Sequence, residues 1–247
     1  MSYIIVGLGN PGSEYENTRH NTGRILVTWF GKSLDAEWKT DKKLNAQIAK
    51  VKIKVHRGET SVSLILPDTF MNKSGNSIKP LYPIGKTSVV KEAEKMVVIY
   101  DDLDLPFGTT KISFNKSSGG HKGLESIIKA VKTEKFARIR VGISPTTPSG
   151  KTRPLRVAKQ VGRVKKPSGV RSRGATSQDL GSTFQSKANE KGDKVYSSRR
   201  EEAVTKLILG KFKPEELLQL KKISKKINQA LETFVTSGLQ KAMMEFN

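Results

Sequence analysis

The chain has 247 residues, enough for one large domain or two small ones and enough to bury a hydrophobic core. Its 45 lysines and arginines exceed its 23 acidic residues, and the net charge of +22 predicts a polyanionic partner, with nucleic acid favoured over an anionic membrane surface. The absence of cysteine excludes disulfides and thiolate metal sites.

The chain also lacks the signals of a membrane or secreted protein. No apolar run approaches the roughly 20 residues of a membrane span, and a strand is predicted at the very N-terminus, so we expect no signal peptide. The three histidines, His20, His56 and His121, lie far apart without ligand spacing, which argues against a zinc site. We expect a cytoplasmic protein, with the mitochondrion as the alternative because some imported proteins have no readable presequence.

The strongest functional pattern lies near the N-terminus. Residues 3–6 are apolar and typical of a buried strand, and they lead into a glycine-rich loop at 7–12. Apolar residues at helical spacing begin only near Thr22. Asn10 and His20 therefore lie at the two ends of one polar loop between a strand and a helix.

The glycines of this loop also fit the fingerprint G-x-G-x-x-G of dinucleotide-binding proteins, whose helix starts directly under the pyrophosphate. Here the helical pattern begins only after a polar loop, and no clear strand that ends in an acidic residue follows. A nucleotide-dependent oxidoreductase is therefore only the third class of function that we consider.

A predicted hairpin follows the first helix. Residues 47–55 and 61–66 alternate between apolar and polar side chains, which is typical of strands with a solvated outer face. A polar loop at 67–75 comes next, and the apolar pattern after it predicts a helix that Pro80 and Pro83 interrupt.

Residues 96–100 are entirely apolar and predict a central strand, and Asp101 follows directly. Carboxylates at the carboxyl end of a buried strand occupy the crevice where open α/β sheets bind ligands. Asp101 is therefore a candidate functional residue. For Asp102 and Asp104 the alternative is that they cap the following turn.

A Ser/Gly-rich turn at 117–123 opens the next predicted helix, between short strands at 111–114 and 138–143. Free amides and the positive end of the helix dipole would suit a phosphate or carboxylate there. The alternative is that the glycines only permit a tight turn. The basic residues His121 and Lys122 favour anion binding.

The composition changes at Ser144. Residues 144–200 hold 14 lysines and arginines and 3 acidic residues, a net charge of +11, with four prolines and few large apolar residues, so we expect a flexible basic insertion. An amphipathic helical pattern follows over 217–234. We predict one α/β domain, residues 1–143 and 201–247, with a mixed twisted sheet and helices on both faces.

Four stretches, in this order and spacing, resemble the signatures of the bacterial-type peptidyl-tRNA hydrolases. They are IVGLGNPGSEYENTRHNTG at 5–23, TFMNKSG at 69–75, DDLDLPFG at 101–108 and GGHKGL at 119–124. The resemblance covers residues 3–143 and, more weakly, 201–240, and it leaves 144–200 unmatched.

The resemblance implies an esterase that cleaves the bond between a peptide and the 3′ ribose of tRNA without a metal or cofactor. His20 matches the family's catalytic base, and Asp101 matches the carboxylate that orients it. Asn10 and Asn72 match amides that position the peptide backbone or the attacking water. The expected partners are peptidyl-tRNA and the ribosome, and we expect a monomer.

The resemblance also implies a peptide groove lined by Tyr15 and Met71, and it places Arg140 in the clamp on the 5′ phosphate of the acceptor stem. Two positions depart from the family pattern. The histidine-asparagine pair of the family is His121-Lys122 here, so an amide that helps to bind substrate is replaced by a cation. The lysine of the clamp is replaced by Ser113, although Lys111 lies on the same strand face and could substitute for it.

Two functions remain open for these residues. As a hydrolase, the chain would use neutral His20, with an ordinary pKa of about 6.5, to deprotonate water. Asp101 would accept from the other ring nitrogen, and Asn10 or Asn72 would donate to the oxyanion. The rival is a non-catalytic RNA-binding adaptor on the same fold, attached to the ribosome or to structured RNA, with Lys122 and the basic insertion as its marks.

Overall fold

The computed structural model describes residues 2–56, 58–82, 89–145 and 201–247, and within these residues seven strands form one mixed sheet in the order β2-β3-β4-β1-β5-β7-β6. Neighbouring strands are parallel in β1/β4, β1/β5 and β5/β7 and antiparallel in the other three pairs. The strands are β1 (Tyr3–Gly7), β2 (Lys39–Asp41), β3 (Ala46–Val55), β4 (Gly58–Pro67), β5 (Met96–Pro106), β6 (Thr110–Phe114) and β7 (Ala137–Ser144).

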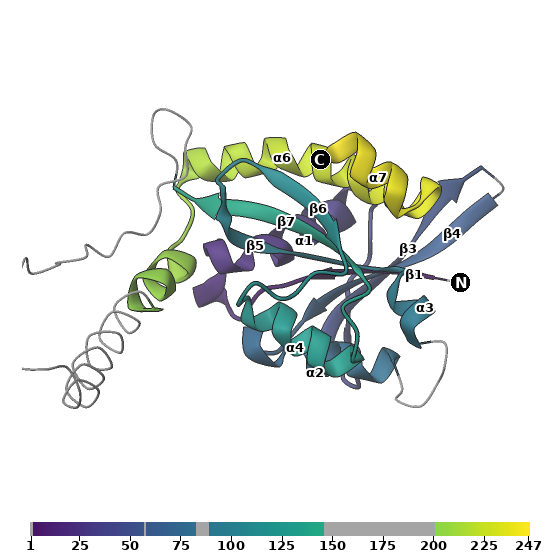
Figure 1. Cartoon of the computed structure of the whole chain (residues 1–247), viewed down its shortest axis with the longest axis horizontal. Coiled ribbons are helices and arrows are strands. Elements are labelled where there is room, and N and C mark those ends of the chain that lie inside the picture. The colour runs from purple at the N-terminus through teal and green to yellow at the C-terminus, as the bar shows by residue number, and fades with distance from the viewer. Residues whose placement is uncertain (1, 57, 83–88, 146–200) are drawn as a thin grey trace, which may run out of the picture. The chain divides into compact units, whose positions relative to one another are not determined.

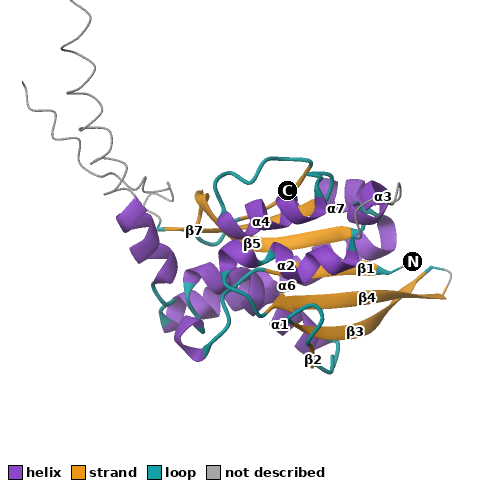
Figure 2. Cartoon of the chain, turned by 90° about the horizontal axis from the view of Figure 1, so that it is seen from below, coloured by secondary structure: helices purple, strands orange, loops and turns teal. Residues whose placement is uncertain are grey.

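Helices cover both faces of the sheet, as Figures 1 and 2 show. One face carries three helices, and the other carries three more, each layer with its own hydrophobic core. This arrangement confirms the predicted α/β class. The first layer consists of α1 (Thr22–Ser33), α6 (Pro214–Ser237) and α7 (Leu239–Phe246), and the second of α2 (Gly75–Ile78), α3 (Val89–Ala93) and α4 (Lys122–Val131).

The two layers explain the two kinds of strand pattern. Strand β1 and the first five residues of β5 are apolar on both faces because helices cover them on both sides. The hairpin strand β3 instead alternates, with Val51 and Ile53 buried and Lys50, Lys52 and Lys54 exposed. The predicted hairpin is therefore present as β3 and β4, and their antiparallel pairing runs from Ala46↔Pro67 to Val55↔Gly58.

The structure differs from the sequence reading at β5. The predicted strand ended at Tyr100, whereas β5 continues to Pro106. It pairs with β7 through Asp102↔Gly142, and after a shift in register the pairing resumes at Pro106↔Ser144. Charged side chains within a strand hide this continuation from a hydrophobicity pattern. The short elements β2, α3 and α7 were not predicted either, and Gly238, with φ 88°, separates α7 from α6.

The chain divides into two compact units, one of residues 1–153 with 208–247 and one of residues 154–207. All of the elements named above belong to the first unit. In the second unit the described residues, 201–207, are helical. The predicted basic insertion falls almost entirely on 146–200, outside the described residues. In the described part of the chain, no helix is both long and apolar enough to cross a bilayer.

Candidate active site

His20 and Asp101 meet at the carboxyl ends of two neighbouring parallel strands. β1 leads through a loop into a 3-10 turn, η2 (Arg19–Asn21), which carries His20, while Asp101 lies within β5. The Nδ1 atom of His20 lies 3.0 Å from each carboxylate oxygen of Asp101. Both residues are buried, at 8% and 3% exposure. The two candidates for catalysis, 81 positions apart, are therefore in direct contact.

The charge of Asp101 controls the protonation of this pair. Burial by itself would lower the pKa of His20, but the charge and hydrogen bond of Asp101 outweigh it, so the pKa of His20 lies above its usual 6.5. Burial by itself would raise the pKa of Asp101, but His20 and His121 hold it well below its usual range. Asp101 is therefore an anion at neutral pH, and it stabilises a proton on His20.

A second imidazole, that of His121, shares the same carboxylate. Its Nε2 atom lies 3.0 Å from Asp101 Oδ1, and its ring lies 5.1 Å from the ring of His20. Its Nδ1 atom accepts a hydrogen bond of 3.2 Å from the amide of Leu124, so His121 is the N-cap of α4. In the neutral ring the proton must then lie on Nε2, where it is donated to Asp101.

The same hydrogen bonds bear on metal binding. Ligand atoms of His20, Asp101 and His121 all lie within 4.8 Å of one another, a spacing that could hold a metal ion. However, the Leu124 amide donates to Nδ1 of His121, so Nε2 carries the proton and has no lone pair for a metal. The arrangement suits the movement of a proton better than the ligation of an ion.

Asn10 is locked so that its amide nitrogen remains available. Its Oδ1 atom accepts a hydrogen bond of 2.7 Å from the amide of Met71, which fixes the orientation of the side chain. Asn21 holds the backbone of Asn10 on both sides, because its Oδ1 accepts from Asn10 N at 2.8 Å and its Nδ2 donates to Asn10 O at 3.0 Å. In the described part of the chain, the Nδ2 atom of Asn10 has no partner.

Sequence reasoning missed Asn21 as a positioning residue. It also missed Arg19, which ties the His20 turn to the C-terminal part of the first unit. Arg19 donates to both carboxylate oxygens of Glu216, at 2.6 and 2.8 Å, and to the carbonyl of Lys211 at 2.8 Å, and its guanidinium lies 5.0 Å from the Phe212 ring centre. Arg19 and Asn21 both lie within the N-terminal motif at 5–23, and this position was the signal from which they could have been found.

The residues expected to line a peptide groove gather at the end of β4. A 3-10 turn, η3 (Met71–Lys73), places Met71 in the core and leaves Asn72 exposed. Gly123 lies against Met71 so closely that a Cβ atom there would meet the sulfur at 2.4 Å. The ring of Tyr15 packs edge-on against the ring of Phe70, with the ring centres 6.3 Å apart, and Phe70 is 55% exposed.

The predicted phosphate clamp lies on β6 and β7. Lys111 and Arg140 are paired across these strands, and Lys111 is exposed whereas Ser113 is buried. The Nε atom of Arg140 lies 2.5 Å from Asp102 Oδ2. Asp102 also accepts from the amide of Asp104 at 2.8 Å, a local contact within β5 where its register with β7 shifts, so Asp102 does not cap a turn that follows the strand.

Comparisons with known proteins show which proteins this chain resembles. The family model for peptidyl-tRNA hydrolase matches residues 4–157. A peptidyl-tRNA hydrolase of Listeria welshimeri is 41% identical over 141 residues, 57% of this chain and 72% of the relative, and one of Aquifex aeolicus is 44% identical over 140 residues, 57% and 68% of the two chains. A crystal structure of peptidyl-tRNA hydrolase from Acinetobacter baumannii has the same fold, with a TM-score of 0.67, 24% identity and coverage of 99% of this chain and 94% of that one.

Proposed function

This chain belongs to the peptidyl-tRNA hydrolase family, and from that premise we propose how its residues divide the work of hydrolysing peptidyl-tRNA. The enzyme is a hydrolase that acts on the ester bond joining the peptide to the 3′ ribose of tRNA. The contact between His20 and Asp101 is the observation that carries the assignment of catalytic roles.

His20 acts as the general base. Its Nδ1 atom is held by Asp101, which leaves Nε2 as the nitrogen that takes a proton from the attacking water. Asp101 fixes the ring and stabilises the imidazolium formed in the transition state, as its charge already does in the free enzyme. General-base catalysis of this kind contributes about 10²–10⁴-fold to the rate.

Asn10 supplies a donor to the oxyanion. Because its Oδ1 is occupied by the Met71 amide, its Nδ2 is the group that can donate to the developing charge on the carbonyl oxygen. Asn72, which is exposed and has no side-chain hydrogen bond among the described residues, positions the peptide backbone. His121 acts through Asp101, because both of its ring nitrogens are already bonded within the protein.

The tRNA part of the substrate would contact the basic face of β6 and β7. Lys111 and Arg140 lie side by side there, and Arg140 uses Nε for Asp102, so its terminal nitrogens are left to hold a phosphate. Lys122, with 71% of its side chain exposed, stands where the family has an amide and would add a charge contact near the ester. Association with the ribosome, a monomeric state and a cytoplasmic location, with the mitochondrion as alternative, stay predictions from the sequence.

A non-catalytic RNA-binding adaptor is not favoured. An adaptor has no need for an imidazole and a buried carboxylate in contact, with a locked amide beside them. The relatives at about 40% identity are also named as hydrolases rather than as binding proteins.

The substitution His20→Ala tests the assignment. We expect kcat for an N-blocked aminoacyl-tRNA to fall by about 10²–10⁴-fold, while the affinity for deacylated tRNA stays unchanged because the basic surface is intact. His56→Ala is the matched control, since His56 is exposed in the turn between β3 and β4. Full turnover by the His20 variant would refute its role as the base.

A further inference from the structure

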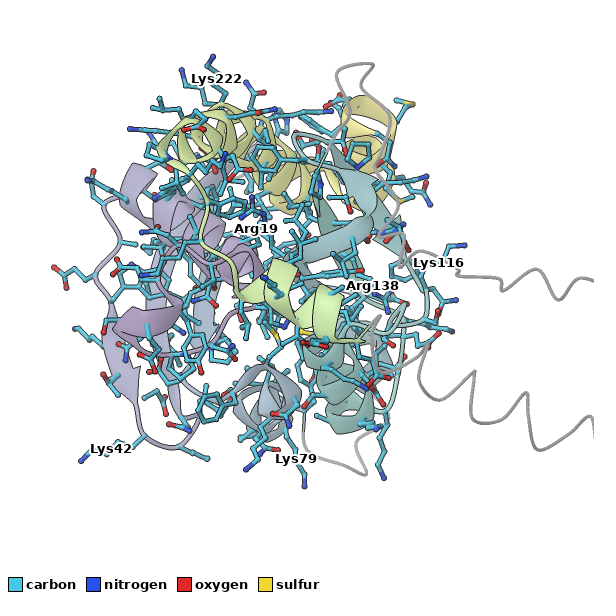
Figure 3. All side chains as sticks on the ribbon, turned by 90° about the vertical axis from the view of Figure 1, so that its left-hand side faces the viewer. Arg19, Lys42, Lys79, Lys116, Arg138 and Lys222 are labelled. Carbon is cyan, nitrogen blue, oxygen red and sulfur yellow. The ribbon has the colours of Figure 1, made fainter. Side chains whose placement is uncertain are left out.

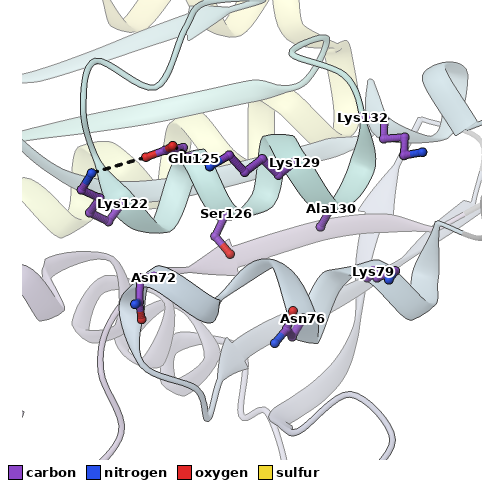
Figure 4. Close-up of a pocket in the computed structure, with 9 residues that line it drawn as sticks. All are labelled: Asn72, Asn76, Lys79, Lys122, Glu125, Ser126, Lys129, Ala130 and Lys132. Carbon is purple, nitrogen blue, oxygen red and sulfur yellow. Dashed lines mark hydrogen bonds and ion pairs between the residues drawn. The ribbon is translucent and has the colours of Figure 1, made fainter.

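A groove of about 560 Å³ runs between α2 and α4, beside the candidate active site (Figure 4). In this view α4 forms one wall, and α2 with the following 3-10 turn, η4 (Lys79–Leu81), forms the other. Asn72 and Lys122 lie at one end, and Lys79 and Lys132 lie at the other. The groove therefore begins at the amide that we assign to the peptide backbone.

The two helices that form the groove are in tight contact at its floor. The amide of Gly75 donates to Ser126 Oγ at 2.9 Å, and a Cβ atom at position 75 would lie 2.1 Å from the Ser126 carbonyl oxygen. Because a side chain on Gly75 would push the helices apart, the glycine is what permits this approach. The groove is thus a preformed feature of the packed fold.

The lining of the groove is strongly cationic. Four lysines and one carboxylate line it, and the carboxylate of Glu125 lies 2.7 Å from Lys129 and 3.7 Å from Lys122. The hydrogen bond and charge of Lys129, helped by Lys122, lower the pKa of Glu125, so it is ionised at neutral pH. The groove lining then carries a net charge of +3.

The order of the strands places the two halves of the substrate on opposite sides of the ester. Asn72 follows β4, the catalytic pair comes from β1 and β5, and Arg140 lies on β7, and these strands are neighbours in the order β4-β1-β5-β7. If the acceptor stem lies over β7, the peptide leaves the ester on the side of β4. That side is the α2/α4 groove.

We propose that the α2/α4 groove binds the peptide part of the substrate upstream of its C-terminal residue, and that it favours peptides with aspartate or glutamate there. From Lys122 to Lys132 the groove follows α4 for about 15 Å, which an extended peptide covers in about five residues. The proposal rests on the proposed function and adds a substrate preference to it.

Three N-blocked pentapeptidyl-tRNAs test this preference, identical except for two upstream residues that are both Asp, both Asn or both Lys. For the wild-type enzyme we expect kcat/KM to rank Asp above Asn above Lys, by about two- to fivefold for each charge, because exposed ion pairs contribute little. The difference should appear in KM rather than kcat, and it should shrink at high salt.

The double variant Lys79→Glu with Lys129→Glu should reverse the ranking of the Asp and Lys substrates. The Asn substrate serves as the reference for this ranking, so a general change in kcat/KM of the variant does not affect the comparison of Asp with Lys. Glu125→Gln should act in the opposite direction and strengthen the preference for Asp. Lys222→Glu, on α6 in the other helix layer, is the matched control and should leave the ranking unchanged.

Three results would overturn the proposal. If the double variant raised KM equally for all three substrates and also bound deacylated tRNA more weakly, the groove would hold RNA instead of peptide. An unchanged ranking in the double variant would show that the groove holds neither. A wild-type enzyme that fails to hydrolyse even the Asn substrate would refute the proposed function, and the inference would fall with its premise.

Discussion

At the scale of single residues, the site depends on one carboxylate shared by two imidazoles. Asp101 accepts a hydrogen bond from His20 and another from His121, and the two imidazoles differ in what their second ring nitrogen does. His20 has one ring nitrogen left for chemistry, whereas His121 uses its second nitrogen to accept from Leu124. In the proposed mechanism, the Asp101 carboxylate therefore orients the His20 ring that takes the proton, and the His121 ring orients the carboxylate.

The raised pKa of His20 predicts the pH dependence of the enzyme. Protonated His20 cannot act as a base, so kcat/KM should fall as the pH drops through a pKa above 6.5. The substitution Asp101→Asn removes the charge that raises the pKa of His20. The burial of His20, which lowers this pKa, remains. We expect the acid limb to move to lower pH and the plateau to fall by about 10²–10⁴-fold. An acid limb that stays in place would mean that Asp101 does not control His20.

At the scale of elements, the site is assembled from the ends of strands and helices that are far apart in the chain. The turn that carries His20 is held by the C-terminal strap of residues 210–216, through the bridge Thr18↔Lys211 and the Arg19–Glu216 ion pair. The carboxylate comes from β5, and the residue that orients it caps α4. Loss of one of these contacts is expected to disturb both packing and catalysis.

Two substitutions of His121 separate its roles in capping α4 and in orienting Asp101. His121→Ala removes the cap and the donor to Asp101, so we expect about 1 kcal/mol less stability in urea unfolding and a lower kcat. His121→Asn can still accept from the Leu124 amide, since Asn is a favoured N-cap, but it cannot reproduce the bond to Asp101. We expect it to recover the stability and not kcat. Recovery of both would show that His121 acts only as a cap.

At the scale of the whole molecule, no lysine among the described residues is buried, whereas some arginines there are structural. Figure 3 shows Lys42, Lys79, Lys116 and Lys222 projecting outward, whereas Arg19 and Arg138 lie further inside. Arg138 is fully buried, with its guanidinium 4.3 Å from the Phe136 ring centre, and burial lowers its pKa. Exposed lysines, rather than these arginines, are the charges that can meet a polyanion.

The salt dependence of tRNA binding measures how many of these charges take part. The logarithm of affinity should fall linearly with the logarithm of salt concentration, with a slope near −0.9 for each neutralised phosphate of a duplex. Residues 144–200 carry +11 of the total +22. Replacing 146–200 by a short glycine-serine linker should therefore weaken binding and flatten the slope, while hydrolysis at saturating substrate continues. An unchanged slope would show that this segment does not contact tRNA.

The sequence alone predicted most of the long elements from local patterns, and the family resemblance predicted the candidate site residues. Continuous apolar runs predicted the covered strands, alternation predicted the hairpin, and the quoted motifs led to His20 and Asp101. The extension of β5 to Pro106 escaped this reasoning, since it depends on pairing with β7, which shifts register after Asp102 and resumes at Pro106, and not on hydrophobicity.

Only the tertiary structure decided how the groups meet. The 3.0 Å contact of His20 with Asp101 exists because β1 and β5 are adjacent and parallel, with Gly7 opposite Ile99. The lock on Asn10 and the basic groove between α2 and α4 likewise join residues distant in the chain. Such contacts leave no local periodicity, because packing and hydrogen bonds across the fold select them.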